Sequence, residues 1–205
     1  MGLRWWLLLC NRDGAAEYYI ARLQHYGRLF RRSLHLNYVL ANTLAGLLPD
    51  FFSGSIRTRL YRRAGFAVGH GAFLMGNLDL SSAVPGFYDN LVIGPGVTIA
   101  DHVRINLDAR VTIGRNVAIA PHVLIFTGSH KTGPGSARLG APIGLPVTIE
   151  DGAWVRLGAI ILPGVTVGRG SIVAAGAVVM KDVPPNSYVE GNPAEVVHRL
   201  PWADR

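Results

Sequence analysis

The chain has 205 residues, of which 49% are hydrophobic and 16% are charged, and this composition excludes a mainly disordered chain. Its single cysteine, Cys10, excludes a disulfide framework and a cysteine-rich zinc module. The longest apolar run, Trp5–Cys10, has six residues, whereas a membrane-spanning helix needs about 20. No small-residue cleavage site follows this run, so we predict a cytoplasmic protein.

The net charge of +7 lies entirely in the first third of the chain. Residues 1–65 contain ten arginines and three acidic residues, whereas residues 66–205 contain ten basic and ten acidic residues. Arginine binds phosphate groups through a bidentate fork. Either this segment is a solvated basic surface, or it meets an anionic partner such as lipid or a lipid-linked sugar phosphate. No nucleic-acid-binding motif accompanies the charge, so we predict no nucleic-acid partner.

The spacing of apolar residues predicts helices within residues 15–64. The first is marked by apolar side chains at helical spacing, namely Tyr19, Leu23, Tyr26 and Phe30. A second helix is predicted over Leu36–Leu48 and ends before Pro49. A third is predicted from about Ser55 to Ala64 and ends at Gly65.

After about residue 90 the pattern changes to a repeat of six residues. The aliphatic positions that carry it are Ile93, Ile99, Ile105, Ile113, Ile119, Ile125, Ile149, Val155, Ile161, Val167, Val173 and Val179. A small or β-branched residue lies four positions after nearly every one of them. A helix has a period of 3.6 and cannot carry this pattern. Each hexapeptide is instead expected to form a short strand and a sharp bend, and successive repeats stack into a solenoid around an aliphatic core.

The hexapeptides resemble those of the left-handed parallel β-helix acyltransferases, in the branch of maltose, galactoside, nodulation and exopolysaccharide O-acetyltransferases. The most specific matching segments are Thr127–His130, Gly152–Val155, Leu162–Gly168, Lys181–Asn186 and Gly191–Ala194. The resemblance implies a mainly β fold with an N-terminal helical segment and a short C-terminal helix. We expect a basic amphipathic helical leader over residues 1–65. Residues 66–205 are then the acyltransferase domain, with an inserted loop over 127–146.

The inserted loop interrupts the repeat once, and a long loop in a compact domain is usually functional. It contains a single histidine, His130. In the resembled family the histidine at this position is the general base that takes a proton from the acceptor hydroxyl, a task that suits an imidazole at neutral pH. Asn106 stands where the family keeps an asparagine that positions the acceptor or the base. The alternative for Asn106 is an ordinary β-helix corner residue.

The resemblance also implies that acetyl-coenzyme A is the co-substrate and lies in a groove between adjacent solenoids. The oxyanion donor is expected near the backbone amide of Leu157, and small residues around Leu157 and Ala175 would line the pantetheine arm. Phosphate contacts are expected from Lys181, with Arg199 or His198 helping. Met180 stands where relatives often carry a threonine. No metal is predicted, because His102, His122 and His130 lack the close pair that solenoid zinc sites show.

These residues favour an acetyl-CoA-dependent O-acetyltransferase that modifies a hydroxyl of a sugar, such as an exopolysaccharide or glycolipid precursor. Two alternatives stay open: an N-acyl or longer-chain acyltransferase of the same fold, and a non-catalytic solenoid scaffold. The resemblance implies a homotrimer. We also hypothesise that residues 1–65 dock peripherally on the inner membrane face, with Arg57, Arg59, Arg62 and Arg63 on anionic head groups. The alternative is that these helices only cap the open end of the solenoid.

Overall fold

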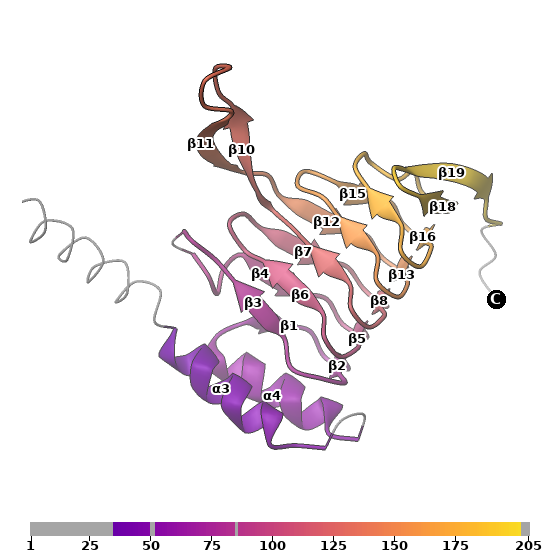
Figure 1. Cartoon of the computed structure of the whole chain (residues 1–205). Coiled ribbons are helices and arrows are strands. Elements are labelled where there is room, and N and C mark those ends of the chain that lie inside the picture. Colours follow the sequence, from indigo (N-terminus) through magenta and orange to yellow (C-terminus); the bar gives the residue numbers. More distant parts are fainter. Residues whose placement is uncertain (1–34, 50–51, 85, 202–205) are drawn as a thin grey trace, which may run out of the picture. The chain divides into compact units, whose positions relative to one another are not determined.

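The structure is a computed structural model that describes residues 35–49, 52–84 and 86–201 (Figure 1). Residues from Asn37 onward form one compact unit. The helix predicted around Tyr19 and Phe30 and the apolar run Trp5–Cys10 lie outside the described residues.

The compact unit is built on a parallel β-helix. Each coil contributes one strand to each of three sheets (Figure 1). The first sheet contains β1 (Ala67–Val68), β4 (Leu91–Ile93), β7 (Val111–Ile113), β12 (Val147–Ile149) and β15 (Thr166–Val167). The second contains β2 (Phe73–Leu74), β5 (Thr98–Ile99), β8 (Ala118–Ile119), β13 (Trp154–Val155), β16 (Ile172–Val173), β18 (Ser187–Gly191) and β19 (Ala194–Arg199). The third contains β3 (Asp79–Ser81), β6 (Arg104–Asn106), β9 (Leu124–Ile125), β14 (Ile160–Ile161) and β17 (Val178–Val179). The predicted solenoid is therefore confirmed.

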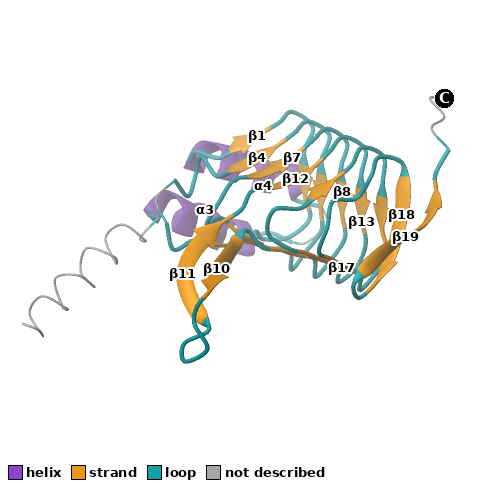
Figure 2. Cartoon of the chain, turned by 90° about the horizontal axis from the view of Figure 1, so that it is seen from above, coloured by secondary structure: helices purple, strands orange, loops and turns teal. Residues whose placement is uncertain are grey.

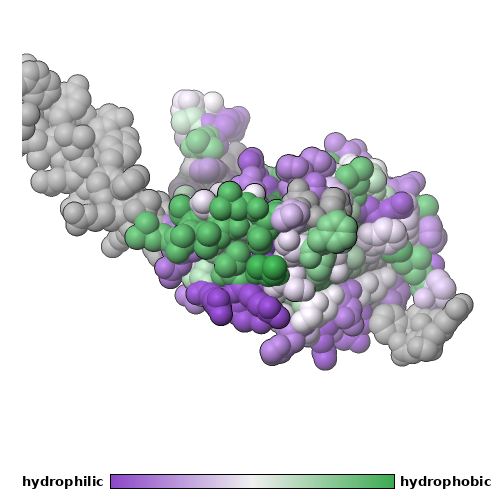
Figure 3. Space-filling view, turned by 90° about the horizontal axis from the view of Figure 1, so that it is seen from below, coloured by the Kyte–Doolittle hydropathy of each residue, from purple (hydrophilic) through white to green (hydrophobic). Residues whose placement is uncertain are grey.

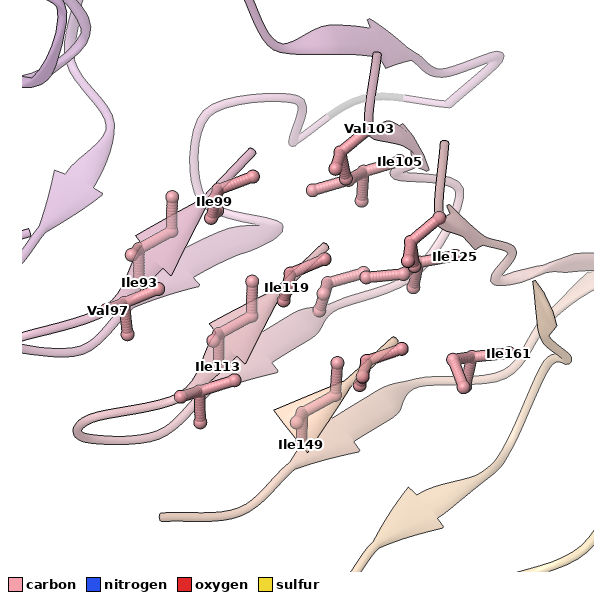
Figure 4. Close-up of a cluster of buried hydrophobic side chains, with 14 of the residues drawn as sticks. Ile93, Val97, Ile99, Val103, Ile105, Ile113, Ile119, Ile125, Ile149 and Ile161 are labelled. Carbon is pink, nitrogen blue, oxygen red and sulfur yellow. The ribbon is translucent and has the colours of Figure 1, made fainter. Parts of the chain in front are cut away.

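The core consists of aliphatic columns inside the coils (Figure 4). Ile93 pairs in register with Ile113, which pairs with Ile149, so equivalent side chains stack from coil to coil. Every aliphatic position of the predicted repeat is at most 2% exposed. Burying one such side chain contributes roughly 1.5–3 kcal/mol, so the columns supply most of the drive for stacking. One coil precedes the predicted start of the six-residue repeat at about residue 90. Its strands β1, β2 and β3 bury Val68, Leu74 and Leu80 at the same spacing.

Two helices cover the first coil: α3 (Leu36–Gly46) and α4 (Gly54–Ala64), both at positions the sequence predicts. Gly65 ends α4 in the left-handed conformation, with φ of 115°. In Figure 1 the helices lie at one end of the stack and the β18–β19 pair lies at the other.

The helices satisfy backbone groups that the first coil leaves without a neighbouring strand. The Tyr61 hydroxyl accepts a hydrogen bond from the N–H of Leu78 at 3.0 Å and donates one to the Asn42 side chain. The Tyr38 hydroxyl donates to the Leu78 carbonyl at 2.8 Å and accepts from the Leu80 N–H at 3.1 Å. Burial raises the pKa of Tyr61 above its usual value, so this hydroxyl keeps the proton it donates.

Arg57 links both helices to the solenoid and is 0% exposed. Its guanidinium donates to the carbonyls of Ala45 at 3.2 Å and Leu48 at 2.6 Å, at the C-terminal end of α3, and to that of Met75 at 2.8 Å in the first coil. The hypothesis that Arg57 contacts a lipid head group is therefore wrong. A cation at the C-terminal end of a helix is also favoured by the helix dipole.

The C-terminal region differs from the prediction of a short helix. Residues 187–199 form the antiparallel pair β18–β19, and β18 adds in parallel to β16, with Val189 opposite Val173. The Gly191–Asn192–Pro193 segment has turn chemistry, and the strand that follows contains the β-branched Val196 and Val197. These preferences, together with the strand edge that β16 offers, favour a hairpin over a helix.

Replacement of Arg57 tests its role in joining the helices to the first coil. We expect Arg57→Leu to lower the free energy of unfolding by about 3 kcal/mol or more, because three carbonyls lose their donor and a buried unsatisfied group costs about 1–3 kcal/mol. Chemical denaturation measures this change. The matched control is Arg59→Leu on the exposed face of the same helix, for which we expect a change within about 0.5 kcal/mol. Equal effects of the two substitutions on the free energy of unfolding would contradict the role of Arg57 in joining the helices to the first coil.

Candidate active site

The inserted segment is an antiparallel hairpin of β10 (Gly128–Thr132) and β11 (Leu139–Gly144), which projects from the solenoid (Figures 1 and 2). It follows β9 of the third sheet and precedes β12 of the first sheet, so it leaves the coil at the corner between these sheets. The sequence predicts an irregular loop here, whereas most of the segment is paired. His130 lies on β10, opposite Pro142 of β11.

A dense hydrogen-bond network fixes the base of this hairpin. The side-chain oxygen of Asn106, at the end of β6, accepts from the Gly128 N–H and from the Thr127 hydroxyl, both at 2.9 Å. The same hydroxyl accepts from the Ala109 N–H at 2.9 Å, and Thr127 is 0% exposed. Asn106 therefore holds the backbone at Gly128, two residues before His130.

Asp108 extends this network and is a residue that the sequence analysis missed. One carboxylate oxygen accepts from the Ala83 N–H at 2.6 Å, and the other accepts from the Asn106 amide at 3.1 Å. A Cβ atom at Gly128 would lie 2.6 Å from the Asp108 carboxylate, so a larger residue there would have to displace this carboxylate. A signal was present in the sequence, since Asn106 and Asp108 stand two residues apart and directly after a strand.

The hairpin, the corner after β6 and the segment after β3 line a partly open cavity of about 420 Å³. Its polar lining includes Asn106, Asp108, Ser129 and His130, and its apolar lining includes Val84, Phe126, Pro142 and Ile143. The structure thus brings together His130 and Asn106, the two predicted catalytic residues. The His130 side chain is exposed and makes no hydrogen bond to another described residue, so its ring is open to a ligand in the cavity.

The residues predicted to bind coenzyme A lie on other parts of the solenoid. Leu157 and Ala175 occupy exposed turns of successive coils, joined by a 2.8 Å hydrogen bond from the Gly176 N–H to the Leu157 carbonyl. These turns connect the second sheet to the third, whereas His130 stands at the corner between the third and the first. Leu157 and Ala175 therefore lie at the edge of the third sheet opposite to the edge that carries His130.

Met180 and Lys181 follow β17 at the same corner as the hairpin, and both are exposed. The Arg199 guanidinium donates to the Pro185 carbonyl at 3.1 Å and to the Ser187 hydroxyl at 2.9 Å, so it ties β19 to the segment before β18. His198 stacks on Tyr188 with ring centroids 4.9 Å apart.

Another pair of histidines meets at a different corner of the solenoid. The rings of His102 and His122 are stacked, with centroids 4.9 Å apart, beside a cavity of about 540 Å³. Both side chains are exposed, and the stacking of coils makes them a close pair that their spacing of 20 residues did not reveal. In the described part of the chain, no group of three or more His, Cys, Asp and Glu side chains is arranged to hold a metal ion.

The chain is similar to known acetyltransferases in sequence and structure. The family described as bacterial transferase hexapeptide (six repeats) matches residues 146–181. Nodulation protein L of Rhizobium meliloti is 43% identical over 109 residues, which is 50% of this chain and 60% of that protein. A hexapeptide-repeat acetyltransferase of Vibrio cholerae, solved with acetyl coenzyme A, has a TM-score of 0.69 and 28% identity over 82% of this chain and 87% of that one. A galactoside acetyltransferase solved with coenzyme A has a TM-score of 0.67 and 26% identity over 82% of this chain and 80% of that one.

These findings confirm the resemblance to hexapeptide-repeat acyltransferases of the sugar O-acetyltransferase branch, and with it the left-handed β-helix fold. The chain spans 44% to 63% of the length of the first curated relatives that it matches.

The Thr127 hydroxyl provides a test of the network at the base of the hairpin. We expect Thr127→Val to lower the free energy of unfolding by about 1–3 kcal/mol, because the part-buried Ala109 N–H loses its acceptor. Chemical denaturation measures the loss, and hydrogen exchange should show faster exchange at the amides of Ala109 and Gly128. Thr132→Val, on the exposed part of β10, is the control and should leave both measurements unchanged. Unchanged exchange in Thr127→Val would show that the network does not hold the hairpin.

Proposed function

We propose that the protein is an acetyl-CoA-dependent O-acetyltransferase whose acceptor is a hydroxyl of a sugar or glycolipid, with His130 as general base. The observation that carries this proposal is the convergence of His130, Asn106 and Asp108 on one cavity. Relatives named for acetyl transfer, and neighbours solved with acetyl-CoA or coenzyme A, support the choice of donor. The cavity lining contains both polar and apolar side chains, and a sugar ring presents both hydroxyl edges and C–H faces.

In the proposed reaction the acceptor oxygen attacks the carbonyl carbon of the acetyl thioester while His130 takes the hydroxyl proton. The tetrahedral intermediate then collapses, the C–S bond breaks, and coenzyme A leaves as the thiol with that proton. No covalent enzyme intermediate is required, because the thioester is already activated. Asn106 contributes by holding the hairpin in place, since its side-chain oxygen is occupied by Thr127 and Gly128.

The negative charge that develops on the thioester oxygen needs a hydrogen-bond donor. We assign this role to the backbone amide of Leu157. Its N–H has no acceptor among the described residues, and the Leu157 side chain is 52% exposed, so the turn is accessible to a ligand. Ala175 in the next coil presents a small side chain along the same edge, where the pantetheine arm can run. Lys181 is exposed and supplies a cation for the phosphates.

We further propose a homotrimer with active sites between neighbouring chains. His130 stands at one edge of the third sheet, whereas Leu157 and Ala175 line the other edge. Placing the hairpin of one chain against the Leu157–Ala175 edge of the next closes the site, and threefold symmetry repeats this contact three times.

Replacement of His130 tests the base directly. We expect His130→Ala to lower the rate of acetyl transfer by roughly 10²–10⁴-fold, the usual contribution of a positioned acid–base group. The dissociation constant for coenzyme A should barely change, whereas Lys181→Ala should mainly raise it. Thiol release with a panel of sugars measures transfer, and His70→Ala, an exposed residue in the first coil, is the control. Full turnover by His130→Ala would contradict the assignment of His130 as the base. If no sugar of the panel causes thiol release by the unchanged chain, the proposed function is wrong.

A subunit-mixing experiment tests the shared site. His130→Ala and Ala175→Trp chains should each be inactive, and light scattering of either should give a mass near three chains. Co-expression of the two should restore part of the activity, because some interfaces then combine an intact His130 with an intact Ala175 from the neighbour. If each chain builds its own site, the mixture will stay as inactive as its components.

A further inference from the structure

Helix α3 presents its large aliphatic side chains to the outside of the unit. Val39, Leu40, Leu44 and Leu47, in and just after the helix, are 49%, 62%, 42% and 77% exposed. Phe52, just before α4, is 93% exposed. Figure 3, which views the molecule from below, shows a continuous hydrophobic area over this end. We name the set Val39, Leu40, Leu44 and Leu47 the aliphatic face.

The inner side of α3 explains why the larger residues point outward. This side carries the small Ala41 and Ala45, which are 5% and 0% exposed, together with the hydrogen-bonding Tyr38 and Asn42. Small residues let the helix approach the first coil closely, and the polar groups satisfy backbone atoms there. The aliphatic face takes no part in the core, and exposed apolar areas of this kind mark surfaces that contact a partner or a membrane.

The charges of α4, which is hydrogen-bonded to α3, favour an anionic partner. Arg59 and Arg63 are exposed, and together with Ile56 they lie on the outer side of α4, opposite the buried Arg57 and Tyr61. Residues 35–49 and 52–65 contain no aspartate or glutamate. A hydrophilic strip runs beside the hydrophobic area in Figure 3. Arg62 differs from this pair, because its guanidinium donates to the Val68 carbonyl at 3.0 Å and the Gly69 carbonyl at 2.9 Å.

We propose that the aliphatic face, with Arg59 and Arg63, docks the protein on the surface of an anionic lipid bilayer. The apolar face of a surface helix lies at the boundary between lipid head groups and acyl chains, and neighbouring arginines bind the lipid phosphates. A second copy of this chain would bring like-charged arginines together, so charge complementarity favours lipid over self-association. No helix in the described ranges is both long enough and apolar enough to span a membrane. This proposal is independent of the acetyl-transfer chemistry.

Co-sedimentation of the full chain with vesicles tests the proposal. The vesicles are neutral phosphatidylcholine alone, or the same lipid with phosphatidylglycerol. We expect binding to the anionic vesicles that weakens as salt rises, and much weaker binding to neutral ones. Leu40→Gln with Leu44→Gln should lower the partition coefficient at least roughly tenfold. Arg59→Gln with Arg63→Gln should lower it roughly thirtyfold at low salt.

Matched controls separate this surface from general hydrophobicity and charge. Val196→Gln with Val197→Gln changes two exposed aliphatic residues at the opposite end, and Arg110→Gln with Arg169→Gln changes two exposed arginines of the solenoid. Both control pairs should bind vesicles like the unchanged chain. Wild-type binding by the Leu40/Leu44 or the Arg59/Arg63 pair would overturn the proposal. A change in solution mass of the Leu40/Leu44 pair, without a change in vesicle binding, would assign the face to a protein contact instead.

Discussion

The fold depends on one constraint, which is that the end of a parallel β-helix exposes backbone N–H and C=O groups that need partners. Each inner coil satisfies these groups through its neighbours, but the first coil has a neighbour on one side only. Here the hydroxyls of Tyr38 and Tyr61 and the guanidinium of Arg57 supply the missing partners. This requirement places hydrogen-bonding and small side chains on the inner side of α3, and the aliphatic residues of that helix are left facing outward. The cap and the exposed apolar surface thus have the same physical origin.

The same coil geometry positions the candidate site. Aliphatic columns set the register between coils, and that register brings Asn106 of β6 beside Thr127, which lies 21 residues later. The network around these two residues holds the base of a hairpin that departs from the solenoid. His130 is then two residues beyond a fixed point, although its own side chain is exposed. The solenoid thereby holds the base of a projecting element that carries an exposed histidine, and functional residues are often found on such elements.

Much of the fold could be predicted from the sequence, because every aliphatic position that the six-residue period marks from Ile93 to Val179 is buried. The first coil was missed, although Val68, Leu74 and Leu80 follow the same spacing, since the segment after Ser81 breaks the series before Ile93. His130 and Asn106 were predicted from the resemblance, and the structure places both at one cavity. Asp108 and the His102–His122 pair could not be found by periodicity, because their environment depends on contacts between coils. The same limit applied to Arg57, which periodicity marks as a polar helix residue but cannot show to be buried.

The central claim is that the solenoid and its hairpin place His130 at the reacting hydroxyl of an acceptor sugar. A crystal structure of the protein with a non-reactive coenzyme A analogue and a sugar acceptor tests it most directly. The account predicts density for the sugar in the cavity of Asn106, Asp108 and His130, with one hydroxyl oxygen about 3 Å from a ring nitrogen of His130. A sugar bound beside His102 and His122, or one with every hydroxyl beyond hydrogen-bond reach of His130, would contradict it.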